Sequence, residues 1–226
     1  MQTLSFDRPE FKQALRDYFY LIENHYPEKG SLKLVGDRYR LTRVERSLLY
    51  RGVTSRQQAV NIAKRLVTTP QQKIIIDGYN VLLTLLNYRL GHYVFISMDN
   101  LCRDAGSLFG KIRNEELFRE CAASLSGYLI KRKTEKIILY LDSPVSQSRR
   151  HLKFLHKPIA EANIKVDIEL VKSADQALLM HKSGTLATSD SAILFRFENP
   201  IIDIPRCILE TKYKAKLFKL NMLLEL

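Results

Sequence analysis

The sequence predicts an α/β protein: a domain built on a mostly parallel sheet with helices on its faces, preceded by a small all-helical N-terminal domain. From residue 73 onward, short apolar runs of the kind buried in parallel sheets alternate with helical patterns. Residues 1–70 show helical spacing. A polar stretch with a proline, Thr68–Gln72, separates the two patterns. We therefore expect one domain over residues 1–70 and another over residues 73–226.

The N-terminal domain is predicted to hold three helices. The first begins at Pro9, carries apolar residues at helical spacing and ends at Gly30, and the basic residues 32–41 are expected to be irregular. T-x-x-E at Thr42 and S-x-x-Q at Ser55 are typical of helix starts, and they predict helices over residues 43–52 and 55–67. This pair is either a helix-turn-helix that binds DNA or a plain helical hairpin with a basic face.

The C-terminal domain is predicted to alternate strands with helices. The strands are expected at Ile74–Ile76, Tyr93–Ile96, Ile137–Leu141, Val166–Leu170, Leu186–Thr188 and Ile201–Ile204. The helices between them are expected at Glu115–Ile130, Ser148–Asn163 and Ala174–Lys182. The tail, Lys212–Leu226, is expected to be a basic amphipathic helix that packs on its own domain or on a second subunit, which would make a homodimer.

Composition narrows the class of partner. The net charge of +12 favours a polyanion, with nucleic acid first. The three cysteines form no CxxC pair, which argues against a disulfide framework or a thiolate zinc site. No apolar run reaches the roughly 18 to 20 residues of a membrane-spanning helix, and the N-terminus lacks an apolar signal core. We therefore expect a cytoplasmic protein with no membrane and no secreted partner.

Four aspartates follow predicted strands. Asp77 ends IIID, Asp142 ends IILYLD, Asp190 ends the strand in GTLATSD, and Asp175 follows another strand at a helix start. The carboxyl ends of parallel strands meet at one edge of the sheet, where ligands collect. Carboxylates gathered there would raise one another's pKa unless a divalent cation neutralised them, and oxygen ligands suit Mg²⁺ or Mn²⁺. Each aspartate could instead cap a helix or form a turn.

A divalent cation on a basic domain suggests hydrolysis of phosphodiester bonds, because the ion polarises a phosphoryl oxygen and lowers the pKa of an attacking water. Gly78 is expected to permit a sharp turn after Asp77, and Asn80 offers a second polar group.

Further polar residues are candidates for contact with the substrate. The helix that starts after Asp142 could bind a phosphate through Ser143, Ser148, Arg149 and Arg150. Alternatively, it is simply a capped helix with a solvated basic end. Arg103 and Asp104 follow the second predicted strand, and together with Asp99 they could line the same cleft or pair with one another.

The segments IIIDGYN, KSADQAL and LATSDSAIL together resemble the motifs of the PIN-like nuclease superfamily, closest to its NYN-domain branch. The resemblance covers about residues 73–205. It implies a Rossmann-like three-layer α/β/α domain that cuts RNA with Asp-bound Mg²⁺ or Mn²⁺. Carried onto this sequence, it makes Asp77, Asp175 and Asp190 catalytic metal ligands, with Asn80 as a polar support.

This sequence departs from the family pattern at one position. Many such domains have a further acid two residues after the third aspartate, where this chain has Ala192. Asp142 is a candidate to supply that metal ligand, and Asp104 is another. An acid on the middle helix is also common in the superfamily, and the candidates here are Glu116 and Glu120.

The sequence thus predicts a metal-dependent endoribonuclease acting on RNA. A catalytically degenerate PIN-like RNA-binding protein is one alternative. A helix-turn-helix regulator that binds DNA through residues 43–67 is another. The helical front resembles an uncharacterised domain found fused to PIN-like domains.

Overall fold

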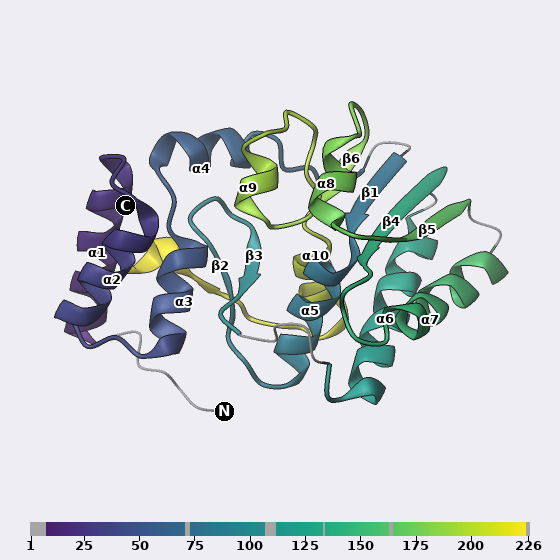
Figure 1. The fold of residues 1–226 in the computed structure, drawn as a ribbon, viewed down its shortest axis with the longest axis horizontal. Coiled ribbons are helices and arrows are strands. Elements are labelled where there is room, and N and C mark those ends of the chain that lie inside the picture. The colour runs from purple at the N-terminus through teal and green to yellow at the C-terminus, as the bar shows by residue number, and fades with distance from the viewer. Residues whose placement is uncertain (1–7, 71–72, 107–111, 133, 163–164, 225–226) are drawn as a thin grey trace. The chain divides into compact units, whose positions relative to one another are not determined.

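The computed structural model describes residues 8–70, 73–106, 112–132, 134–162 and 165–224 (Figure 1). The chain forms two compact units, and each is assembled from separate stretches of sequence. The first unit comprises Met1–Lys64, Leu90–Ser107 and Lys216–Leu226, and the second comprises Arg65–Arg89 and Leu108–Ala215. The division therefore differs from a single boundary near residue 70, and part of the linker expected there, Gln71 and Gln72, lies outside the described residues.

Four helices and a small sheet make up the described part of the first unit. The helices are α1 (Pro9–Glu23), α2 (Glu28–Arg38), α3 (Arg43–Gly52) and α4 (Arg56–Ala63). The sheet has the order β3-β2-β7, from β2 (Val94–Ile96), β3 (Cys102–Asp104) and β7 (Phe218–Lys219), and the 3-10 helix η1 (Leu220–Leu223) follows it. Both predicted helix starts at Thr42 and Ser55 are confirmed, because each hydroxyl accepts a hydrogen bond from the backbone N–H three residues later.

One core joins the three stretches of the first unit. Phe11 and Leu15 of α1 and Leu48 of α3 are buried in the same cluster as Phe95 of β2 and Leu220 of η1. The described residues of 90–106 and 216–224 therefore contribute side chains to the hydrophobic core of the helical front rather than to the α/β sheet.

The second unit is an α/β structure with a parallel four-stranded sheet. Its strands are β1 (Lys73–Asp77), β4 (Lys136–Asp142), β5 (Val166–Val171) and β6 (Thr185–Ala187), in the order β5-β4-β1-β6. Every neighbouring pair in this sheet is parallel. The chain adds β4 and then β5 on one side of β1, and it returns to the other side for β6. The strand order reverses next to β1, and this is the position at which open parallel sheets bind ligands, beyond the strand carboxyl ends.

Helices pack on both faces of this sheet (Figure 1). The helices in the described part of this unit are α5 (Gly78–Arg89), α6 (Glu115–Lys131), α7 (Ser148–Glu161), α8 (Ala174–Leu179), α9 (Ser191–Leu194) and α10 (Ile204–Lys212). Of these, α5, α7 and α8 contact the strands most extensively. Alternate strand residues point to opposite faces. Ile75 and Ile138 pack with Leu178 of α8 on one face, and Leu139 and Leu141 lie against the start of α5 on the other.

Several expectations from the sequence were wrong. The first helix ends at Glu23 instead of Gly30, and residues 28–38 form helix α2, where residues 32–41 were expected to be irregular. The predicted strand Ile201–Ile204 is one bridge residue, Ile201, ahead of α10. The predicted strand at residues 93–96 belongs to the sheet of the first unit instead of the parallel sheet. The tail is a two-residue strand followed by a 3-10 helix, not an amphipathic α-helix. No helix in the described residues is long and apolar enough to cross a membrane.

Candidate functional site

Asp77 occupies the carboxyl end of β1 and is 5% exposed. Its Oδ1 accepts a hydrogen bond from the backbone N–H of Asn80 at 3.1 Å, and its Oδ2 accepts one from the Thr188 hydroxyl at 3.2 Å. The parallel register pairs Ile76 with Ala187, which brings the next residues, Asp77 and Thr188, side by side. The carboxylate is thus held by a buried strand, a helix start and the loop after β6.

Gly78 is required for close packing against β4. A Cβ at this position would lie 2.8 Å from the Tyr140 backbone oxygen and 2.7 Å from side-chain atoms of Leu139 and Leu141. Helix α5 can therefore begin directly after Asp77 and against β4 because residue 78 has no side chain.

The loop after β6 is fastened to the start of α5 by a second contact. The side-chain oxygen of Asn80 accepts hydrogen bonds from the backbone N–H of Ser189 at 2.9 Å and from its hydroxyl at 3.0 Å. Thr188 and Ser189 were not among the residues expected to act at the site. The signal that could have found them is the pair of hydroxyl residues between β6 and Asp190, because the register places them beside Asp77 and Asn80.

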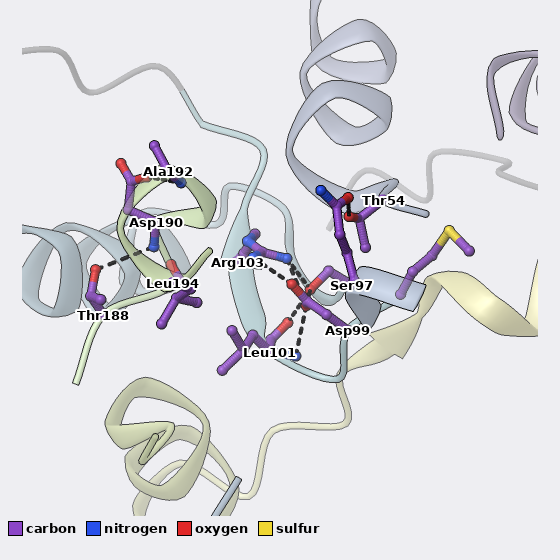
Figure 2. A network of polar contacts seen from close by, with 12 residues as sticks. Thr54, Ser97, Asp99, Leu101, Arg103, Thr188, Asp190, Ala192 and Leu194 are labelled. Carbon is purple, nitrogen blue, oxygen red and sulfur yellow. Dashed lines mark hydrogen bonds and ion pairs between the residues drawn. The ribbon is translucent and has the colours of Figure 1, made fainter. Parts of the chain in front are cut away.

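Asp190 and Asp142 each hold a nearby helix start. Oδ1 of Asp190 accepts a hydrogen bond from the N–H of Ala192 at 2.7 Å, and the Asp190 N–H donates to the Thr188 hydroxyl at 3.2 Å (Figure 2). Oδ1 of Asp142 accepts from the N–H of Ala174 at 2.8 Å. Asp190 therefore does cap a helix, α9, as one reading of the sequence had it, and Asp142 links the end of β4 to the start of α8.

Asp175 lies in the first turn of α8, and Ser173, not Asp175, caps that helix. Its carboxyl group has a pKa above its usual value, first because neighbouring protein partly shields it from water and then because the Asp190 and Asp142 carboxylates repel its charged form. Asp175 is nevertheless an exposed residue, so its side chain is accessible from solvent.

Burial and neighbouring acids act together on Asp77. The pKa of Asp77 is raised to about 7, mainly by loss of water and also by the carboxylates of Asp175 and Asp142, while the hydrogen bonds from Asn80 and Thr188 oppose the shift. The four predicted aspartates are therefore linked at the carboxyl edge of the sheet, because Asp142 and Asp175 act on Asp77, and Asp142 and Asp190 act on Asp175. The charged neighbours that act on Asp77 and Asp175 are carboxylates, so this edge favours a bound cation or a proton.

The four acids do not form a finished coordination shell. Among the residues that the structure describes, no three His, Cys, Asp or Glu side chains form a group that could hold a metal ion. The middle helix does not complete the set, because Glu120 pairs with Arg89 at 2.6 Å and Glu116 lines a pocket elsewhere with Arg150. The four carboxylates lie at the same edge of the sheet, and they would have to move closer together to coordinate one ion.

The residues expected to contact the substrate fall into two groups. At the start of α7, Ser148 is buried and donates to the Ser143 carbonyl at 3.3 Å, Arg150 pairs with Glu115 at 2.7 Å, and Arg149 is exposed.

Arg103 and Asp104 belong to the first unit, whereas the carboxyl edge of the parallel sheet belongs to the second unit. Two 2.7 Å contacts join the Arg103 guanidinium to Asp99, which is the pairing that the sequence offered as the alternative (Figure 2). Asp104 pairs with Arg51 at 2.9 Å. Both side chains therefore have partners within the first unit.

Two family models match this chain, with a boundary between them near residue 66, and the second of them also spans residues 90–106, which the structure places in the first unit. Residues 67–207 match the family described as a domain of unknown function, DUF5616, and residues 10–65 match a protein of unknown function, DUF434. An uncharacterized protein of Methanocaldococcus jannaschii is 29% identical over 187 residues, which cover 81% of this chain and 88% of the relative. No solved structure matches the chain significantly. Because the match to residues 67–207 covers more than half of the sequence, this chain belongs to the DUF5616 family.

Proposed function

We propose that the protein is a metal-dependent endoribonuclease with a PIN-like second unit, and that RNA is cleaved at the carboxyl edge of the parallel sheet. One observation carries the proposal: aspartates that follow four separate strands lie close enough for Asp142 and Asp175 to act on Asp77, and for Asp142 and Asp190 to act on Asp175, beside the point where the strand order reverses. A buried carboxylate surrounded by further carboxylates is costly to keep charged, so such a cluster favours a function that supplies a cation. The net charge of +12 favours a polyanionic substrate.

Asp77, Asp175 and Asp190 would hold Mg²⁺ or Mn²⁺, with Asp142 as a further ligand. Oxygen atoms are the ligands that both ions accept in proteins. When bound, the ion would polarise the phosphoryl group and lower the pKa of the attacking water. Asn80, Thr188 and Ser189 would position the Asp77 carboxylate and the loop that carries Asp190 through the hydrogen bonds described above.

The test is cleavage of single-stranded RNA by the purified full chain with Mg²⁺, with Mn²⁺ and with a chelator. We expect cleavage with either ion, none with the chelator, and a fall of at least about 100-fold in Asp77→Asn, because the shape stays and the negative ligand is lost. RNA binding should survive in that variant.

Asp167→Asn is the matched control. Asp167 lies on β5, pairs with Lys136 at 2.9 Å and does not contribute to the pKa of Asp77, so this variant should cleave at the wild-type rate. Equal rates for Asp77→Asn and the wild type would exclude Asp77 from the reaction.

A second candidate is an RNA-binding protein of the same fold that has lost catalysis. It is favoured by the lack of a ready-made group of three ligands among the described residues, and by Ala192 at a position where related domains carry an acid. This candidate predicts salt-dependent RNA binding with no cleavage in any divalent metal. Restoring an acid with Ala192→Asp would then be the informative variant, because gain of Mn²⁺-dependent cleavage would identify the missing ligand.

A further inference from the structure

We propose that the exposed face of α7, with the pocket beside Phe154, binds a single strand of RNA and leads it toward the carboxyl edge of the sheet. The proposal rests on the proposed function for the identity of the polyanion. It adds a binding surface away from the four aspartates.

Arg149, Lys153 and Lys157 form a basic row along α7. They are spaced four residues apart and therefore share one face of the helix, and all three are exposed. The row spans about 12 Å at the rise of an α-helix. Within the described residues none of the three has an ion-pair or hydrogen-bond partner. Like charges four residues apart destabilise a helix, so a row without acidic partners favours binding of an anion.

The row is placed to guide a strand toward the acids. Helix α7 begins at Ser148, six residues after Asp142 ends β4, so its first turn lies next to the carboxyl edge of the sheet. From there the helix returns toward the start of β5 at Val166. A phosphate backbone lying along α7 would therefore have one end near the aspartates.

A pocket adjoins this helix and can accept a base. It has a volume of about 360 Å³ and is lined by Glu115, Glu116, Arg119, Arg150 and Phe154. The Arg150 guanidinium pairs with Glu115 at 2.7 Å and lies over the Phe154 ring, 6.0 Å from its centroid. That distance is at the limit of about 6 Å for a cation–π contact. An aromatic ring and guanidinium planes provide stacking surfaces for bases, and the carboxylates can accept hydrogen bonds from base amino groups.

The experiment measures binding of a labelled single-stranded RNA to the full chain in chelator, so that cleavage plays no part, across a range of salt concentrations. In the triple variant Arg149→Gln, Lys153→Gln, Lys157→Gln, the slope of log K against log salt should become shallower by about 2, because each phosphate contact on a single strand contributes roughly 0.7. Phe154→Leu should weaken binding at least about fivefold, because it removes a stacking ring and keeps an apolar side chain.

The matched control removes the same charge elsewhere on the second unit, in Lys131→Gln, Lys165→Gln, Lys182→Gln. These lysines are exposed and precede β4, β5 and β6, at the opposite end of the sheet. The control should keep the wild-type slope, and circular dichroism melts should show both triple variants folded. Equal losses in the two triple variants, or a wild-type slope in the α7 variant, would overturn the proposal.

The two proposals fail separately in this design. If α7 carries the binding surface but no metal supports cleavage, the salt slope changes as predicted while the nuclease proposal falls. If cleavage depends on Asp77 but the α7 variant binds like the control, the nuclease proposal stands and the binding surface falls. If duplex RNA displaced the labelled strand as well as unlabelled single-stranded RNA does, that would also contradict a surface that prefers single strands.

Discussion

The carboxyl group of Asp77 is subject to opposing influences on its pKa. Burial and the neighbouring acids raise it to about 7, while an N–H group and a hydroxyl favour the charged form. Near neutral pH, the Asp77 carboxyl group can therefore either hold a proton or, in its charged form, bind a cation. This balance is a property of the residue that can be tested through stability, without any assumption about RNA.

We expect the free energy of unfolding to fall as pH rises from about 4 to 7. In this window the unfolded Asp77 is ionised, with a pKa of about 3.9, whereas the folded carboxyl still holds its proton. The loss is complete above the folded pKa and amounts to a few kcal/mol, on the order expected for such a shift. Asp77→Asn should therefore exceed the wild type in stability at pH 8 and match it near pH 4.

Urea unfolding in chelator at the two pH values measures this difference. Asp167→Asn, at a partly exposed carboxylate, provides the reference. The same pH dependence in wild type and Asp77→Asn would mean that Asp77 is not the group that titrates.

Gly78 is predicted to be intolerant of any side chain. Gly78→Ala places a methyl group 2.8 Å from the Tyr140 carbonyl oxygen, and backbone cannot move aside cheaply, so we expect a loss of about 1 to 3 kcal/mol. Gly127→Ala in α6 is the control, because nothing lies within 4 Å of the added atom and alanine favours a helix by about 0.5 to 1 kcal/mol. Opposite signs in thermal or urea unfolding would confirm the close packing, and equal effects would contradict it.

At the scale of elements, the sequence reveals those elements whose signals are local. The capping residues at Thr42 and Ser55 and the apolar runs of β1 and β4 are visible in a few adjacent residues, and the helices and strands occur there. Helix α2 was missed because its two glycines lower helix propensity, while burial of Val35 in the core outweighs them. Strand β3 is the polar triplet CRD, which has no strand pattern of its own.

The hairpin between β2 and β3 depends on a buried ion pair. Asp99 is fully buried, and it accepts hydrogen bonds from Arg103, from the Ser97 hydroxyl at 2.6 Å and from the Leu101 N–H at 3.3 Å. Asp99→Asn should destabilise the protein by about 3 to 5 kcal/mol, because the Arg103 charge would remain buried without its partner. Lys136→Gln, which breaks a half-exposed pair with Asp167, should cost less than about 1 kcal/mol. Similar losses in both would contradict a structural role for the buried pair.

At the scale of the molecule, the four aspartates were predictable and their supports were not. Each aspartate follows a recognisable strand, and parallel strands bring their carboxyl ends together whatever the loops do. Thr188 and Ser189 act through the β1–β6 register, and the division of Arg103 and Asp104 into the other unit depends on core packing between distant stretches. Neither is encoded in a short segment of sequence.

Residues 1–70 are expected not to fold as an independent domain. The core of the first unit includes Phe95 and Leu220, which a fragment ending at residue 70 lacks. Because small domains have little stability to lose, we expect the amide hydrogens of this fragment to exchange rapidly with solvent. In the full chain, the amide hydrogens of residues 9–63 should be protected from exchange. A fragment with native protection would show that the two later stretches are dispensable.

The central claim is that the aspartates at the carboxyl edge gather around a divalent cation. Anomalous diffraction from a crystal of the protein soaked in Mn²⁺ tests it most directly. We expect a manganese peak within coordinating distance of Asp77, Asp175 and Asp190, and no such peak in crystals of Asp77→Asn. Saturating Mn²⁺ that leaves this edge without a peak, or a peak that persists in Asp77→Asn, would contradict it.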